Sequence, residues 1–421
     1  MFQKALLGNG LRVVTESMPH TRSASICIFI RAGSRYESEV NAGISHFVEH
    51  VLFRGTHKRP TSCDISTEIE GVGGVLNGAT DRETTVYWCK VPQPHFESGL
   101  DVLSDMLTGS RFDADDIEKE RTVIIEEINM TYDAPSSRVG LLIDDLIWHG
   151  HPLGRDIAGT RKSVGSMTRP KLVGYVKRRY TPENTVVSIA GNVTHEEAVA
   201  AVAKVLGNWS ENGVGQGFKA YTGNTGPRLK LEYRDIEQTH LCLAIPGLSI
   251  FDPRHYVLDI MNVILGEGMS CRLFSQVRDR LGLAYSIHSF VDHLSDTGAL
   301  TIYAGVDTSK LELAIQAIED EVFRLRDQLI PEAELTKAKE LAKGHLLLRL
   351  EDSRSVAGWQ GSQEVIKTEI MTVDQVIEKI DAVTPEAIAS MAAELIGLER
   401  IRIAVVGPIK SSAKLKKFIG L

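Results

Sequence analysis

The sequence has few cysteines, and none of them stand in a spacing that binds metal. The five, Cys27, Cys63, Cys89, Cys242 and Cys271, are widely separated, and no Cys-x-x-Cys pair occurs. An odd and scattered set of this kind favours reduced thiols over a disulfide framework, and it gives no reason to assign the cysteines to a metal. We therefore expect reduced, structural thiols, and we look for metal ligands among other residue types.

Long apolar runs and dense basic runs are also missing. No apolar stretch approaches the roughly 18 residues that a membrane span needs, and the net charge of -8 is spread without a Lys/Arg cluster. These absences argue against a membrane span, and also against nucleic acid or an anionic membrane surface as a partner. The first ten residues lead directly into strand-like sequence, so we expect no signal or transit peptide and a cytoplasmic location.

The 421 residues, 43% hydrophobic and 24% charged, are typical of a globular protein of two or three domains. A pattern of Thr, Pro, helix, apolar strand and Gly runs from Thr168 to Gly191 and again from Thr384 to Gly407, with an offset of 216. The repeat predicts an internal duplication of half the chain. With a Gly-rich polar stretch between the halves, we predict domains at 1–211 and 228–421, joined by a linker at 212–227.

The segment His46-Phe-Val-Glu-His50 lies in a predicted helix for which Asn41 or Ser45 is the expected N-cap. In a helix, the two histidines lie one turn apart on one face, and Glu49 lies within about 100° of both. Two such imidazoles can hold zinc, and a carboxylate beside a zinc-bound water can act as its general base. This is the inverted zincin order. Two surface histidines flanking a helical glutamate would look the same.

A second predicted helix, residues 113–133, carries two carboxylates on its apolar face. On a helical wheel, Glu120 and Glu127 fall within the apolar arc that runs from three isoleucines to Val123, whereas Glu126 falls on the opposite side. A buried carboxylate needs a cation or hydrogen-bond donors. The two acids are therefore candidate metal ligands, with a pair at the core edge that reaches water as the alternative.

Three further motifs carry weaker signals. The His-Gly-His motif at 149–151, followed by Pro, is more typical of a loop than of a metal pair. The motif that starts at Gly266 lacks the third glycine and the preceding strand of a nucleotide-binding loop. Arg278 and Tyr285 place a guanidinium and a phenol seven residues apart, and a solvated arginine with a half-buried tyrosine is the default interpretation.

Taken together, these residues resemble the pitrilysin and mitochondrial-processing-peptidase superfamily of zinc metallopeptidases, in its short, single-chain bacterial branch. The resemblance covers nearly the whole chain. Its motifs are His46-Phe-Val-Glu-His50, Leu76-Asn-Gly-Ala-Thr, Arg82-Glu-Thr-Thr-Val-Tyr, Glu120-Arg-Thr-Val-Ile-Ile-Glu-Glu127, His151-Pro-Leu-Gly and Arg278 to Tyr285. It implies an α+β fold of two homologous halves, each a mixed, mostly antiparallel sheet flanked by helices, arranged as a clam shell.

The resemblance also implies roles for individual residues. It implies one zinc ion per chain, held by His46, His50 and Glu127. Glu49 resembles the base that takes a proton from the zinc-bound water, and Glu120 resembles a carboxylate that supports the ligating histidines.

Substrate-binding residues follow from the same resemblance. Arg278 and Tyr285 are implied to reach from the second half to the substrate backbone, near the carbonyl that is cleaved. The implied edge to which a peptide adds as an extra strand consists of Leu76, Asn77, Gly78 and Ala79. Gly78 departs from the larger residue that is common there, which bears on substrate preference.

The predicted function is that of a zinc endopeptidase acting on extended or unfolded peptides. The alternative is a non-catalytic scaffold or substrate-recognition subunit, which the complete pentad and the absence of a long glycine-rich loop make less favourable. A structural or storage zinc site is a third hypothesis. The resemblance further implies a homodimer, or a heterodimer with an inactive homologue.

Overall fold

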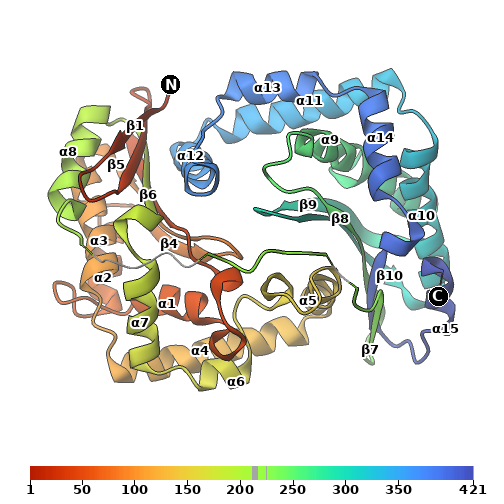
Figure 1. The fold of residues 1–421 in the computed structure, drawn as a ribbon, viewed down its shortest axis with the longest axis horizontal. Coiled ribbons are helices and arrows are strands. Elements are labelled where there is room, and N and C mark those ends of the chain that lie inside the picture. Colours follow the sequence, from red (N-terminus) through yellow and green to blue (C-terminus); the bar gives the residue numbers. More distant parts are fainter. Residues whose placement is uncertain (211–216, 224, 421) are drawn as a thin grey trace. The chain divides into compact units, whose positions relative to one another are not determined.

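The structure is a computed structural model that describes residues 1–210, 217–223 and 225–420 (Figure 1). The chain forms two compact units, each built on one mixed sheet with helices. The predicted α+β class with two related bodies is therefore confirmed. Unit 1 consists of Met1–Ile128, Asp156–Lys219 and Leu348–Thr372, and unit 2 of Asn129–Arg155, Ala220–Leu347 and Val373–Leu421.

Unit 1 has a six-stranded sheet with the strand order β1-β2-β6-β3-β5-β4. Its strands are β1 (Gln3–Leu6), β2 (Arg12–Ser17), β3 (Ser23–Ile30), β4 (Val75–Thr80), β5 (Thr85–Pro92) and β6 (Thr185–Gly191). Strand β2 pairs in parallel with β6, and the other pairs are antiparallel. Although β2 and β3 follow each other in sequence, β6 lies between them. Strand β6 is buried along its whole length, as a central strand covered on both faces must be.

Alternate side chains of β3 enter two different layers of unit 1. Ile26, Ile28 and Ile30 belong to the main core, whereas Cys27 and Phe29 face the other side of the sheet, as the two-residue period of a strand requires. The helices of the main core are α1 (Ile44–Leu52), α2 (Ser62–Glu70), α3 (Phe96–Gly109), α4 (Ala114–Asp133), α6 (Arg161–Gly165), α7 (Arg169–Arg179) and α8 (His195–Leu206). The other face packs against α12 (Ser353–Lys367).

Unit 2 has a five-stranded sheet with the order β7-β11-β8-β10-β9. Its strands are β7 (Leu229–Tyr233), β8 (Gln238–Gly247), β9 (Ala284–His293), β10 (Gly298–Asp307) and β11 (Arg402–Gly407). The helices of its main core are α9 (His255–Gly266), α10 (Leu311–Asp327), α11 (Glu332–Arg349), α13 (Val373–Asp381), α14 (Pro385–Leu395) and α15 (Ala413–Lys416). The opposite sheet face packs against α5 (Pro135–Ile147). No helix among the described residues is long and apolar enough to cross a membrane.

The two sheets correspond strand for strand once β1 is set aside. Strand β6 pairs in parallel with β2 and antiparallel with β3, and β11 pairs in the same way with β7 and β8. The repeated sequence segments are α7 with β6 in unit 1 and α14 with β11 in unit 2. The predicted duplication agrees with this topology, and β4 and β9 are equivalent edge strands.

Two segments lie in the opposite unit from the one that the predicted boundaries give. Residues 129–155, with α5, come from the first sequence half but complete unit 2, and residues 348–372, with α12, come from the second half but complete unit 1. Figure 1 shows α12, in blue, beside the red and orange strands of unit 1. An amphipathic helix shows in its sequence that it has an apolar face, but not which sheet that face will cover. The predicted linker, 212–227, falls partly on residues outside the described ranges.

Candidate metal centre

Helix α1 carries His46, Glu49 and His50, as predicted, and is anchored by its other face. Phe47 and Val48 are fully buried in the core of unit 1, whereas the three polar side chains are half-buried. The two imidazole rings lie with their centroids 4.6 Å apart, because positions i and i+4 stack on one helix face. The helix ends at Leu52.

A buried carboxylate from the preceding loop holds the start of α1. Gly43, with φ 89°, occupies the N-cap position, so the expectation of Asn41 or Ser45 as the cap is wrong. Glu37 accepts hydrogen bonds from the Gly43 N–H (2.7 Å) and from the Ser45 N–H and hydroxyl (2.8 and 2.6 Å). A carboxylate at a helix N-terminus accepts hydrogen bonds from the free N–H groups, and its negative charge interacts favourably with the positive end of the helix dipole. Glu37 therefore caps the N-terminus of α1, a role that the side chain of the N-cap residue itself has in other helices.

Replacing Glu37 with glutamine is expected to destabilise the fold by at least about 2 kcal/mol, because an NH₂ group would face backbone donors in a buried site. The measurement is the free energy of unfolding in denaturant. Glu39→Gln is the matched control, since Glu39 is exposed two residues further along and should change stability by less than about 0.5 kcal/mol. Equal stability of the two variants would contradict the role of Glu37.

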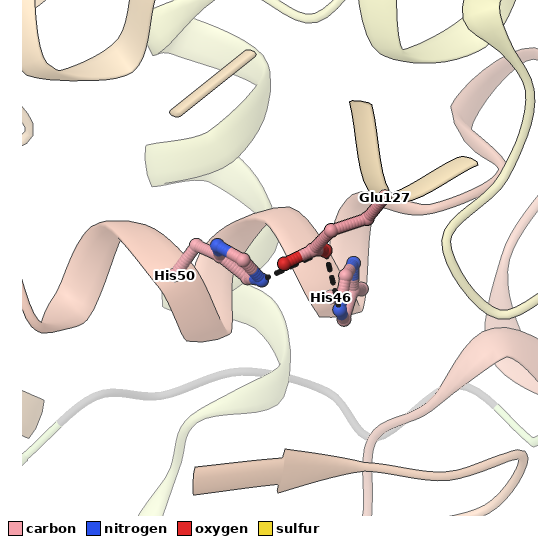
Figure 2. A group of neighbouring side chains, drawn as sticks. All are labelled: His46, His50 and Glu127. Carbon is pink, nitrogen blue, oxygen red and sulfur yellow. Dashed lines mark ion pairs between the residues drawn. The ribbon is translucent and has the colours of Figure 1, made fainter. Parts of the chain in front are cut away.

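Helix α4 brings Glu127 to the two histidines (Figure 2). Its Oε2 lies 3.7 Å from His46 Nε2 and 3.5 Å from His50 Nε2. The side chain is 41% exposed, so Glu127 borders solvent although the wheel placed it within the apolar arc. Its neighbour Glu126 is exposed, on the opposite side as predicted.

Glu120, two turns before Glu127 on α4, is 2% exposed. Its Oε2 accepts a hydrogen bond from His50 Nδ1 at 2.8 Å, and its Oε1 forms an ion pair with Arg54. The expectation that a buried acid on this face has donors is therefore confirmed for Glu120. Because the carboxylate accepts a hydrogen bond from Nδ1–H, the proton of the neutral His50 ring is on Nδ1. The ring lone pair is therefore on Nε2, the atom that faces Glu127. Arg54 was not identified from the sequence.

The donor set of these three residues fits a zinc ion. One ligand atom from each of His46, His50 and Glu127 lies within 4.8 Å of the others. Two donors bound tetrahedrally at about 2.0–2.1 Å from one zinc are about 3.4 Å apart, close to the 3.5 and 3.7 Å between Glu127 and the imidazoles. Two imidazoles and one carboxylate also match a catalytic zinc site, which leaves a fourth position open.

Burial controls the charge of the residues around this point. Burial, together with the neighbouring His50 ring, lowers the pKa of His46 to about 4. His46 is therefore neutral at pH 7, which is the protonation state that binds a metal. Burial also raises the pKa of Glu49, and the hydrogen bond from Thr80 opposes that rise. A base whose pKa is raised towards neutrality is better suited to accept a proton.

Strand β4, the predicted substrate-binding edge, is the last strand of its sheet and lies against α1. Leu76, Gly78 and Thr80 lie on one face of the strand, and Asn77 and Ala79 lie on the other, more exposed face. The Gly78 N–H donates to the Asn77 side chain at 2.8 Å. Thr80 Oγ1 donates to Glu49 Oε2 at 2.6 Å. Sequence reasoning missed this last contact, although Thr80 closes the Leu-Asn-Gly-Ala-Thr motif.

Arg278 and Tyr285 lie together in unit 2, at two local irregularities. Arg278 is in a π-helical segment, Phe274–Arg280, with its guanidinium carbon 4.6 Å from the Phe274 ring centroid and 5.8 Å from that of Tyr285. Tyr285 is the unpaired residue of a β-bulge between β9 and β10, and it is 76% exposed. π-Helical turns and bulges recur at functional sites because they redirect side chains. Neither irregularity was visible in the sequence.

The weaker candidates do not form a second metal centre in the described part of the chain, where only His46, His50 and Glu127 converge as a group of three. His151 Nδ1 instead accepts a hydrogen bond from the Leu153 N–H at 3.3 Å, in the loop expected there. The five cysteines are free, and four of them are buried. The exception is Cys63, which is exposed and so does not fit the expected structural role.

Two protein-family models and several known proteins match this chain. Residues 12–161 match the model of the family described as insulinase (peptidase family M16), and residues 166–341 match the peptidase M16 inactive domain. An uncharacterized zinc protease of Mycobacterium leprae is 38% identical, over 98% of this chain and 93% of that protein. The uncharacterized zinc protease YmxG of Bacillus subtilis is 35% identical, over 97% and 98%.

A solved structure has the same fold. The crystal structure of a protease from Helicobacter pylori has a TM-score of 0.90 with this chain, at 21% identity, and the match covers 96% of this chain and 99% of that one. The expected resemblance is confirmed by the family models and by the relatives along the whole chain. The chain therefore belongs to peptidase family M16, in its short, pitrilysin-like bacterial branch.

Proposed function

We propose that the protein is a zinc-dependent endopeptidase that hydrolyses extended or unfolded peptides. The observation that carries the proposal is the convergence of His46, His50 and Glu127, with Glu49 on the same helix as the two histidines. A structural zinc site rarely places a further carboxylate beside its ligands. The names of the relatives, which call them zinc proteases, support the same activity.

Bound zinc would lower the pKa of a water molecule to about 7 and polarise the substrate carbonyl. Glu49 accepts a proton on its carboxylate as the water oxygen adds to the amide carbon. The same carboxylate returns that proton to the leaving nitrogen as the C–N bond breaks. Glu120, paired with Arg54, holds His50 in the tautomer that presents Nε2. His46 stays neutral because burial keeps its pKa low.

For the substrate, we propose an extended peptide that adds to the open edge of β4, along residues 76–79. The edge position of β4 supports this, because an edge strand leaves alternate backbone groups available for pairing. We also propose that Arg278 and Tyr285 bind the peptide backbone. The family resemblance supports that role, as does the proximity of the two side chains within unit 2.

The second candidate is a non-catalytic scaffold or recognition subunit. The match of residues 166–341 to a family model described as an inactive domain is compatible with it, but the complete set of His46, Glu49, His50 and Glu127 supports an enzyme. We further propose one zinc ion per chain and a dimer, formed with a second copy or with an inactive homologue. Native mass spectrometry with and without zinc measures both quantities.

Cleavage of a peptide library, followed by mass spectrometry, tests the proposed activity. We expect internal cleavage of unstructured peptides by the zinc-loaded protein, loss of cleavage with a chelator and recovery when zinc is returned. The same assay in the presence of an M16 homologue from the same source covers a heterodimeric enzyme. No cleavage under either condition, with zinc bound, would contradict the proposal and favour the scaffold.

A further inference from the structure

The carboxylate of Glu49 is held by strand β4 as well as by its own helix. Thr80 Oγ1 lies 2.6 Å from Glu49 Oε2, within the range of a strong hydrogen bond to a charged acceptor. Thr80 is the last residue of β4 and pairs across the sheet with Thr85. The hydroxyl that reaches the base therefore comes from the strand that forms the candidate peptide-binding edge.

A buried threonine on the neighbouring strand lies beside Thr80. Thr85 is fully buried, and its hydroxyl donates to the Ala32 carbonyl at 3.0 Å. Its oxygen lies 3.4 Å from Thr80 Oγ1. Each hydroxyl has one proton, so with the Thr85 proton on Ala32 and the Thr80 proton on Glu49, the two threonine oxygens are in contact without a hydrogen bond between them. Thr80 is instead anchored through its backbone, which pairs with Thr85 in the ladder between β4 and β5. A hydroxyl fixed in this way holds its acceptor better than one on a mobile surface residue.

The missing side chain at Gly78 leaves space for Glu49 against the same strand. A Cβ at position 78 would lie 3.0 Å from Glu49 Cγ, 3.0 Å from Phe53 Cε2 and 3.1 Å from Glu49 Oε1. Such contacts are tighter than ordinary packing, so the neighbours would have to shift. Glu49 thus lies directly against the backbone of β4, with Oε2 bonded to Thr80 and Oε1 facing Gly78.

We propose that Thr80 is a positioning residue for the general base, and that its hydroxyl fixes the Glu49 carboxylate so that Oε1 is the oxygen that exchanges the proton. The inference rests on the proposed function. It means that β4 has two tasks, because the strand to which a peptide adds also orients the base that activates the attacking water. A base misplaced by about 1 Å costs up to about a hundredfold in rate.

The test compares Thr80→Val, which removes the hydroxyl at nearly constant volume in a strand that accommodates β-branched residues, with Thr80→Ser, which keeps it. We expect kcat of Thr80→Val to fall by about 10- to 100-fold while KM changes by less than about threefold. Thr80→Ser should stay within about threefold of the unmodified protein. Zinc content and thermal stability should be the same in all three proteins.

Two outcomes would overturn the inference. One is an unchanged kcat for Thr80→Val. The other is a raised KM at constant kcat, which would assign Thr80 to substrate binding instead. A double-mutant cycle adds a further check: in the Glu49→Gln background, Thr80→Val should cause no additional loss, because its effect passes through Glu49.

A crystallographic readout is independent of activity and of metal. In crystals of the zinc-free proteins, the Glu49 carboxylate should keep its orientation in Thr80→Ser and turn or become multiply oriented in Thr80→Val. An identical carboxylate in both variants would overturn the inference even if their rates differed. If the unmodified zinc-loaded protein cleaves no peptide, the proposed function fails, whereas an active protein with a fully active Thr80→Val variant refutes the role of Thr80 alone.

Discussion

Substituting Glu49 with glutamine should reduce kcat by about 10²- to 10⁴-fold, the range that a general base contributes, while zinc remains bound. Glutamine has the same shape, and its amide oxygen can still accept the hydrogen bond from Thr80. It cannot accept a proton, because an amide is not basic at neutral pH. The group of candidate zinc ligands consists of His46, His50 and Glu127 and does not include Glu49, so the zinc content of the variant should not change.

The measurements for this variant are kcat and KM on a peptide found in the library experiment, together with zinc per chain and melting temperature. A variant that keeps zinc and fold but loses turnover identifies Glu49 as the base. Retained turnover would contradict the assignment of Glu49 as the general base. A loss of zinc would instead show that Glu49 contributes to binding the metal.

Substituting Glu127 with glutamine should lower the affinity of the protein for zinc, and by more than the other substitutions described above. The Glu127 carboxylate lies within 3.7 Å of both imidazole Nε2 atoms, and an amide supplies neither its negative charge nor an equally strong oxygen donor. Loss of a partner that merely supports a ligand typically costs 10- to 100-fold in affinity. The loss of a ligand itself is expected to exceed about 100-fold.

Competition with a chelator of known affinity measures this change. Glu126→Gln is the matched control, because it removes the same charge from the adjacent position of α4, where the side chain is exposed. We expect that control to bind zinc as the unmodified protein does. Unchanged zinc affinity in Glu127→Gln, or an equal loss in both variants, would show that the third ligand is a different residue.

The elements that could be predicted from the sequence are those with a local and periodic signal. The pentad helix, the long helix that carries Glu120 and Glu127, and the buried strand β6 each have an apolar pattern that repeats within a few residues. The helical wheel placed Glu126 on the exposed side because one helix face is decided by its own sequence. The duplication was visible because the two segments kept the same order of Thr, Pro and Gly.

The features that escaped prediction depend on contacts between distant residues. Glu37 caps α1 from outside the helix, through a loop whose path the sequence does not encode in any periodic way. Thr80 reaches Glu49 across 31 positions of the chain, and a threonine in a strand has an ordinary role in most sheets. The π-helical turn at Arg278 and the bulge at Tyr285 insert a residue into a regular ladder, which leaves no period to detect.

Helix α5, from the first sequence half, completes unit 2, and helix α12, from the second half, completes unit 1. This arrangement determines how the chain would respond to a protease. A single cut between residues 212 and 227 would leave one fragment with most of unit 1 and α5, and a second with most of unit 2 and α12. Each unit would still contain one cluster of buried side chains drawn from both fragments, which includes Ala357 and Phe29 in unit 1 and Val139 and Ala404 in unit 2. Nicked protein should therefore migrate as one species on a sizing column and as two on a denaturing gel. Neither fragment should refold alone, because each lacks the helix that covers one face of its sheet.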